Sequence, residues 1–268
     1  MHIHIVHSTI YRYDPPATGA TQVLRLTPRN HEGQHVVRWR IDVSADARLA
    51  AHEDAFGNIT HVFSADGPLG ELRVDVDGEI ETQNTDGVVR GAVERFTPSL
   101  FLRETALTHA DPAILDLAQS VRGAGDGAVL AALHELMRRL HDGMTYDVAM
   151  TDMVPSAAEA LALKRGVCRD FTHIFLGAAR ALGIPARYVA GYLRLAGAAA
   201  EQDAGHAWAE AFIADFGWVG FDPVNGISPT DSHVRVAVGL DSLGASPVRG
   251  VRYGVGAETM QIAITVDQ

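Results

Sequence analysis

The sequence predicts an α+β protein in which an all-β, sandwich-like region, residues 1–98, precedes an α+β region, residues 99–268. Changes in the spacing of hydrophobic residues along the chain predict this division. Hydrophobic and polar residues alternate up to about Pro98, hydrophobic residues recur at helical spacing from Asp111, and alternation returns from Ala186 onward. Alternation is typical of half-buried strands, and a spacing of three to four is typical of amphipathic helices. We therefore expect two domains, and we place the C-terminal strands in the second.

The first region contains several alternating runs. The clearest are residues 3–13, 37–43 and 71–76, each with apolar side chains on one face and polar ones on the other. Residues that favour turns separate these runs at Asp14-Pro15-Pro16, Phe56-Gly57-Asn58 and Asp77-Gly78. Several short antiparallel strands at this spacing are typical of a β-sandwich.

The second region carries local signals for helices. Asp111-Pro112 offers a cap and a first-turn proline for a helix that runs to about Val121. A second helical run extends from Val129 to Leu140, and Ser156-Ala157-Ala158-Glu159 fits a capping box. Strands then follow from Ala186, at 234–238 and at 262–266.

Composition narrows the class of protein. The chain has 268 residues, 47% of them hydrophobic, with a formal net charge of −11 and a single cysteine. Such acidity argues against binding to nucleic acid or to an anionic membrane surface, and one cysteine excludes an internal disulfide. The N-terminus lacks the pattern of a signal peptide and no apolar run is long enough to cross a bilayer, so we expect a cytoplasmic protein. A homo-oligomer is possible on this composition, and the sequence does not decide the oligomeric state.

The lone cysteine lies where a nucleophile would be placed. Phe171, Ile174, Phe175, Ala178 and Leu182 lie on one face of a helix that stops at Gly183, which puts Cys168 in its first turn. The unpaired N–H groups and the dipole at a helix N-terminus stabilise a thiolate and an oxyanion on an attacked carbonyl. A small buried hydrophobic residue is the ordinary alternative for a single cysteine.

A predicted hairpin supplies partners for the cysteine. His206, Trp208, Glu210 and Phe212 share one face of a strand, and a second strand ends at Asp222. A turn centred on Ala214 would place Asp222 opposite His206, whereas a four-residue loop would shift the two by three positions, roughly 10 Å. In the first case Cys168 can attack, His206 can transfer the proton and Asp222 can orient the imidazole.

These segments resemble the bacterial transglutaminase-like family. The matching stretches are 166–173, 181–193, 206–210 and 217–225, and Tyr11-Arg12-Tyr13, residues 24–29, Gln34 and residues 54–58 resemble the β-rich region that precedes the catalytic core in many members. The resemblance implies a papain-like core, in which the helix that bears the cysteine packs on an antiparallel sheet. It assigns the nucleophile to Cys168, the base to His206 and the orienting acid to Asp222, with Asp170 close to the site. Ala209 and Ala211 are smaller than the residues usual in the family.

The resemblance implies attack on an amide and a thioester on Cys168, without a metal or a cofactor. We favour hydrolysis of a peptide or isopeptide bond in a peptide or protein substrate; transfer from glutamine to an amine, deamidation and a non-catalytic binding module of the same fold are alternatives. Trp208 is expected to wall the site, and Tyr146 and Asn225 are candidates for a second oxyanion donor. His31-Glu32-Gly33-Gln34-His35 matches a zinc-peptidase motif, but that motif requires a helix and this segment leads into a strand.

Overall fold

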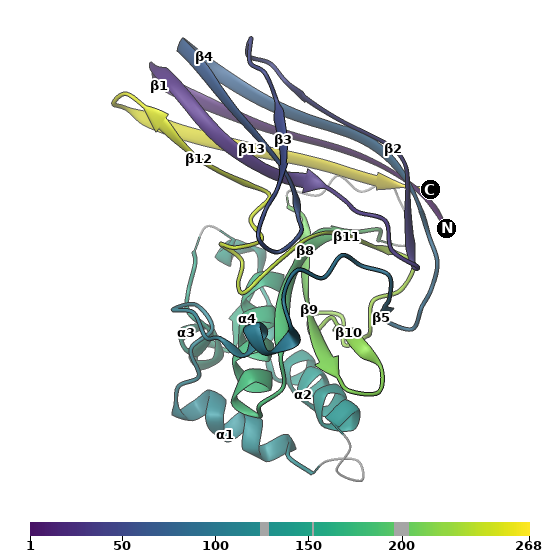
Figure 1. Cartoon of the computed structure of the whole chain (residues 1–268). Coiled ribbons are helices and arrows are strands. Elements are labelled where there is room, and N and C mark those ends of the chain that lie inside the picture. Colours follow the sequence, from purple (N-terminus) through teal and green to yellow (C-terminus); the bar gives the residue numbers. More distant parts are fainter. Residues whose placement is uncertain (124–128, 152, 196–203) are drawn as a thin grey trace.

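The computed structural model describes residues 1–123, 129–151, 153–195 and 204–268. Figure 1 shows a large sheet at one end of the molecule, a cluster of helices at the other and a second sheet between them. The N- and C-termini lie close together at the edge of the large sheet. The fold is α+β with a β-rich N-terminal region, as the sequence predicts.

The large sheet is built on two long paired strands, β1 (His2–Thr27) and β4 (Ile59–Thr82). Strands β13 (Ala257–Asp267) and β2 (Gln34–Val43) flank one half of this pair, and β12 (Val248–Tyr253) and β3 (Ala50–Glu53) flank the other half. The register shifts near the middle of β1, and buried residues from both halves then share one hydrophobic cluster, including Tyr11, Leu24, Phe63 and Leu72. The folded sheet thus encloses its own core.

Three expectations about this sheet need correction. Asp14-Pro15-Pro16 is not a turn, because these residues lie inside β1, where the register with β4 shifts. Asp77-Gly78 is not a turn: both residues pair inside β4, and Gly78 lies opposite Trp39, whose ring would overlap a Cβ at that position. The C-terminal strands β12 and β13, which we placed in the second region, pair with β1 in the large sheet. They complete the edge of that sheet because β1 is long enough to hold one of them along each half.

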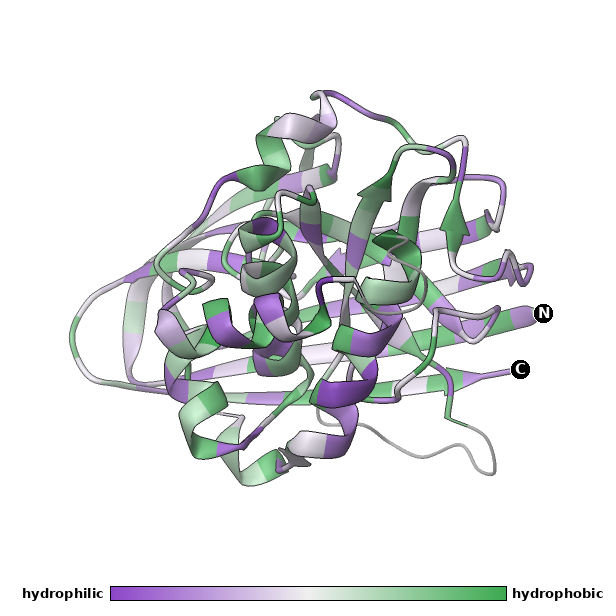
Figure 2. Ribbon diagram, turned by 90° about the horizontal axis from the view of Figure 1, so that it is seen from below, coloured by the Kyte–Doolittle hydropathy of each residue, from purple (hydrophilic) through white to green (hydrophobic). Residues whose placement is uncertain are grey.

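The helical layer follows the local signals in the sequence. The helices are α1 (Pro112–Val121), α2 (Val129–Gly143), α3 (Ala157–Leu163) and α4 (Cys168–Ala181), with 3₁₀ turns η1 (Pro98–Leu102) and η3 (Val148–Met150). Asp111 accepts the Ile114 N–H at 2.9 Å, and Ser156 and Glu159 form the expected capping box. Helices α1 to α3 all contact α4. Figure 2 shows that the helices carry both hydrophilic and hydrophobic residues, as expected where one helix face meets the core.

The second sheet supports α4. Its strand order is β11 (His233–Gly239), β8 (Ala186–Leu193), β9 (His206–Ile213), β10 (Gly217–Phe221) and β5 (Val88–Val89), and every pairing is antiparallel. Helix α4 packs on β8 and β9, where Ala207, Ala209 and Ala211 are fully or almost fully buried. Small side chains here let the helix lie close to the strands, which explains why alanine stands where larger residues are usual. A short parallel pair, β6 (Thr145–Tyr146) and β7 (Arg165–Gly166), lies just before α4.

Candidate active site

Cys168 begins helix α4, as predicted, and is partly buried. Asp170, two residues on, is buried and its carboxylate accepts the Val167 N–H at 2.9 Å, which fixes the backbone just before the cysteine. Gly166 gives this carboxylate room, because a Cβ at residue 166 would lie 2.7 Å from it. Arg169 bonds to the same carboxylate at 3.0 Å and to the Met153 carbonyl. Hydrogen bonds therefore fix the first turn, in which Cys168 lies.

The hairpin of β9 and β10 has a register that falls between the two cases considered above. Gly217 pairs with Ile213 and Phe221 with Ala209, so the turn spans three residues, 214–216. Continuing this register places Asp222 across from Trp208, two positions from the residue that faces His206. A shift of two keeps both side chains on the same face, and diagonal neighbours of this kind are within reach of long side chains. His206 Nε2 donates to Asp222 Oδ2 at 2.7 Å.

His206 connects the cysteine to the carboxylate. One ring nitrogen, Nε2, is bound to Asp222, and the ring also hydrogen-bonds to Cys168, which leaves Nδ1 for the sulfur. Burial by itself would lower the pKa of His206, but the hydrogen bonds to Asp222 and Cys168 outweigh it and raise the pKa to about 10. The imidazole is thus a cation at neutral pH, placed between two groups that are stabilised by positive charge.

Asp222 is fully buried and accepts five hydrogen bonds. Oδ2 accepts from His206, from Asn225 Nδ2 at 2.7 Å and from His233 Nε2 at 3.1 Å, and Oδ1 accepts the N–H groups of Val224 and Asn225 at 3.1 and 3.2 Å. Burial would raise the pKa of this carboxyl, but the hydrogen bonds from His206 and His233 hold it well below its usual range. Asp222 is therefore an anion with a fixed orientation.

His233 is a contact of Asp222 that the sequence did not reveal. Its Nδ1 accepts the Thr230 N–H at 3.1 Å, so a neutral ring carries its proton on Nε2, which faces Asp222. The backbone thereby fixes the tautomer. His233 stands eleven residues after Asp222, at the start of β11, and only the pairing of β11 with β8 brings it to this end of the sheet. No local sequence pattern predicts the contact between His233 and Asp222.

Trp208 lies beside both His206 and His233. The side chain is buried, and its ring lies roughly parallel to that of His206, with centroids 6.1 Å apart and an interplanar angle of 29°. It meets His233 edge-on at 5.4 Å. Gly191, which pairs with His206 in the neighbouring strand, makes room for this ring, because a Cβ there would lie 2.7 Å from it. Trp208 thus restricts both imidazoles to one orientation.

A buried ion cluster continues from Trp208 along the same face of β9. Glu210 is fully buried and binds Arg187 Nε at 2.7 Å and Arg235 Nε at 2.8 Å, while Arg187 also bonds to Glu94 and stacks over Trp218. Burial would raise the pKa of Glu210, but the two guanidinium groups lower it to about 2. The sequence signal for this cluster is the presence of charged residues within otherwise apolar strands. Its role is to support the sheet beneath His206.

The structure separates the two candidates for an oxyanion donor. The side-chain amide of Asn225 is already bound to Asp222, so it holds the carboxylate in place. Tyr146 pairs with Gly166, two residues before Cys168, and its side chain is about half exposed. Partial burial and the adjacent Cys168 both raise the pKa of the Tyr146 phenol. The backbone N–H groups of Thr145 and Asp147 both hydrogen-bond toward β7. Because backbone N–H groups point alternately to the two sides of a strand, the N–H of Tyr146, which lies between them, points away from β7.

Among the described residues, two groups of histidines are candidate metal sites. His31 lies in a turn, where it bridges to Gln34, and His35 belongs to β2, so the two do not share a helix face as the zinc motif demands. His206, Asp222 and His233 do cluster. A tetrahedral zinc ion, however, holds its ligand atoms about 3.3 Å apart. The separations of 2.7 and 3.1 Å fit the hydrogen bonds described above.

Family comparisons agree with the architecture. A model of the bacterial transglutaminase-like N-terminal region matches residues 3–81, and a model of the transglutaminase-like superfamily matches residues 116–223. The second match covers Cys168, His206 and Asp222. In the part of the chain that the structure describes, helices are too short or too polar to cross a membrane.

Similar proteins are known as sequences and as a structure. Uncharacterized proteins of Mycobacterium leprae and Mycobacterium bovis are 29% and 28% identical over 279 and 290 aligned residues; the alignments cover 98% of this chain and 98% and 91% of those proteins. The crystal structure of a putative cysteine protease from Cytophaga hutchinsonii superposes with a TM-score of 0.78 and 21% identity, over 100% of this chain and 91% of that one. This similarity extends to both sheets.

Proposed function

We propose that this chain, which belongs to the transglutaminase-like superfamily and shares its fold with a putative cysteine protease, hydrolyses amide bonds through a thioester on Cys168. The observation that carries this proposal is the position of His206, which hydrogen-bonds to both Cys168 and Asp222. A neutral cysteine in apolar packing would need neither partner. The substrate we propose is a peptide or isopeptide bond in a peptide or protein.

The reaction follows from this arrangement. The thiolate of Cys168 attacks the carbonyl carbon, and the negative charge moves to the carbonyl oxygen. The N–H of Cys168, which has no acceptor among the described residues, and the N–H of Tyr146 are the groups we propose to stabilise that oxygen. The tetrahedral intermediate collapses, the C–N bond breaks and the imidazolium of His206 gives its proton to the leaving amine.

Water completes the cycle. His206, now neutral, removes a proton from a water molecule that attacks the thioester carbonyl, and the C–S bond breaks to release a carboxylic acid. Asp222 stays ionised throughout and stabilises the imidazolium whenever it forms. We favour water over an amine as acyl acceptor because Cys168 is partly exposed and hydrolysis needs no second binding site.

A paired assay tests the proposal and separates it from its alternatives. The protein is incubated with a peptide library that includes glutamine donors, with and without a fluorescent primary amine, and cleavage, ammonia release and amine incorporation are measured. We expect cleavage that disappears in Cys168→Ala and survives in the control Ala51→Ser, which alters an exposed residue of β3. Amine incorporation would instead identify a transglutaminase. Undiminished cleavage by Cys168→Ala would overturn the mechanism.

A further inference from the structure

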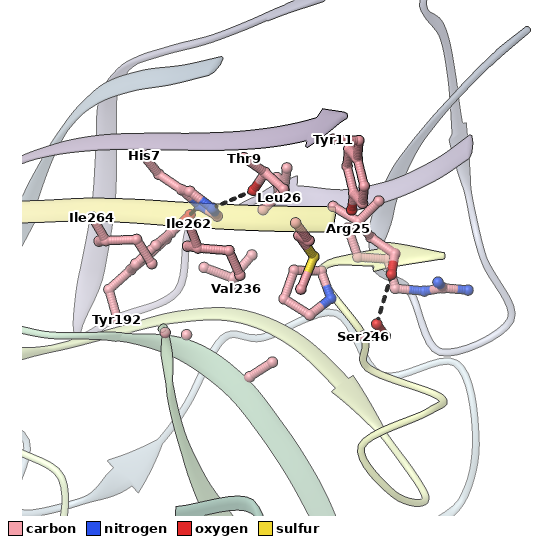
Figure 3. Close-up of a pocket in the computed structure, with 16 residues that line it drawn as sticks. His7, Thr9, Tyr11, Arg25, Leu26, Tyr192, Val236, Ser246, Ile262 and Ile264 are labelled. Atoms are coloured by element: carbon pink, nitrogen blue, oxygen red, sulfur yellow. Dashed lines mark hydrogen bonds between the residues drawn. The ribbon is translucent and has the colours of Figure 1, made fainter. Parts of the chain in front are cut away.

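A cavity of about 180 Å³ lies between the two sheets and plays no part in the chemistry above. Figure 3 shows it bounded by the C-terminal strand β13 on one side and by Tyr192 and Val236 of the second sheet on the other. Most of its lining is apolar, including Leu26, Val236, Pro247, Ile262 and Ile264. An apolar cavity of about 150 Å³ is large enough to bind benzene. This cavity can therefore hold a small organic molecule.

Three polar side chains meet in its wall. His7 Nδ1 is 2.9 Å from the Tyr192 hydroxyl, and Nε2 is 2.9 Å from Thr9 Oγ1. All three residues are buried. Burial lowers the pKa of His7 to about 4, against a smaller opposing effect of Asp75, so the ring is neutral at physiological pH. Figure 3 shows this group at one end of the cavity.

The number of protons in this group exceeds the number of hydrogen bonds. A neutral imidazole has one N–H, and each hydroxyl has one O–H, which gives three protons. Only two hydrogen bonds join the three side chains, and neither hydroxyl has another partner among the described residues. Whichever tautomer His7 adopts, one hydroxyl proton remains without an acceptor beside the cavity. An unsatisfied buried donor is unfavourable, and a ligand with an acceptor atom would relieve it.

The lining does not favour an ionic ligand. His7 is neutral, and Arg25, which contributes to the wall, is ion-paired with Asp54 at 3.0 Å. In Figure 3 the guanidinium group of Arg25 points away from His7. We propose that the cavity binds a small, uncharged, mainly apolar molecule that carries one hydrogen-bond acceptor, such as a ketone or an ester carbonyl. Its acceptor oxygen binds the spare hydroxyl proton of Tyr192 or Thr9, and its apolar part contacts Ile262 and Ile264.

Two probes of similar size test this proposal on the full chain. Acetophenone carries a carbonyl and ethylbenzene does not; each is titrated into methyl-labelled protein and followed by NMR. We expect shifts at the methyl groups of Leu26, Val236, Ile262 and Ile264, and roughly three- to tenfold tighter binding of acetophenone, the value of one hydrogen bond. Equal affinities, shifts centred elsewhere, or no shifts up to the solubility limit, as expected if the cavity holds only water, would each overturn it.

A variant that fills the cavity provides an independent check. Ala190 is buried and lines the cavity, so Ala190→Leu should place its larger side chain in the space and reduce acetophenone binding at least tenfold. Ala51→Leu makes the same substitution on the exposed strand β3 and should bind like the wild type. Retained binding in a folded Ala190→Leu protein would contradict the location. If that variant fails to fold, the titration of the wild type decides the question.

Discussion

Replacing Asp222 by asparagine should remove the charge that keeps His206 protonated. The shift in the pKa of His206 from 6.5 to about 10 corresponds to about 5 kcal/mol of stabilisation of the imidazolium. Asparagine has the same shape but no charge, so burial is then opposed only by the contact with Cys168, and the pKa of His206 should fall toward its ordinary value of 6.5. A full return to 6.5 would lower the protonated fraction of His206 at pH 8 from about 99% to about 3%, roughly thirtyfold.

Two measurements follow this change. NMR of isotopically labelled histidine gives the pKa of His206 directly, and the rate of alkylation by iodoacetamide reports on one site because the chain has a single cysteine. We expect the His206 resonance to titrate near pH 10 in the wild type and closer to 6.5 than to 10 in Asp222→Asn. Alkylation at pH 6 to 8 should slow by at least tenfold in the variant, because the thiolate loses its cationic partner.

A matched control distinguishes this effect from a general loss of negative charge. Asp215→Asn removes a carboxylate from the exposed turn between β9 and β10, without a hydrogen bond to His206. It should leave both the titration and the alkylation rate unchanged. An Asp222→Asn protein that is folded by near-ultraviolet circular dichroism, yet still titrates near pH 10, would refute the assignment of Asp222 as the group that charges His206.

Three further results are expected. Glu210→Gln should reduce the free energy of unfolding in urea by about 3–5 kcal/mol, because it removes the carboxylate that binds Arg235 and leaves buried Arg187 with Glu94 alone. Glu135→Gln, at a partly exposed position of α2, should change it little, and equal effects of the two substitutions would contradict this reasoning. His233→Phe should lower the pKa of His206 less than Asp222→Asn does and should reduce kcat more than it changes KM, because His233 positions Asp222 without touching the substrate; an unchanged titration would argue against that role. Thermal stability should be greatest near pH 6.5 and should fall toward pH 10, because the unfolded chain loses a proton that folded His206 keeps. Below pH 6.5 stability should fall more steeply, by up to about 4 kcal/mol per pH unit, because the unfolded chain protonates three histidines that stay neutral when folded: His7, His31 and His173. A maximum above pH 8 would contradict the signs of these shifts.

The helices could be predicted because their signals are local. Asp111, the capping box at Ser156 and the glycine at residue 183 each act within one or two turns of chain, and the structure places helix ends at or next to all three. Cys168 could be placed in a first turn for the same reason. Asp170 and Gly166, which contact the same turn, lie within two residues of Cys168. The arrangement around Cys168 therefore depends on residues that are close in the sequence.

Pairing between distant strands could not be predicted. The C-terminal strand β13 lies about the whole length of the chain away from β1, and alternation shows that both are strands without showing that they are partners. His233 was missed for the same reason, since it meets Asp222 only after β11 has paired with β8. The prediction of a turn at Asp77-Gly78 was wrong because glycine also occurs where a large ring, here that of Trp39, packs directly on a strand.

The hairpin shows how far the strand register can shift while His206 and Asp222 stay in contact. The sequence allowed several turn lengths, and the one adopted places His206 and Asp222 two positions apart in the ladder. A shift of one would have put them on opposite faces of the sheet, whereas a shift of two keeps them on one face. The imidazole spans this diagonal, and the ring of Trp208, which lies across from Asp222 in this register, stacks beside the imidazole. The geometry of the site thus depends on the parity of the register more than on direct opposition, and parity can be read from the alternation of the sequence.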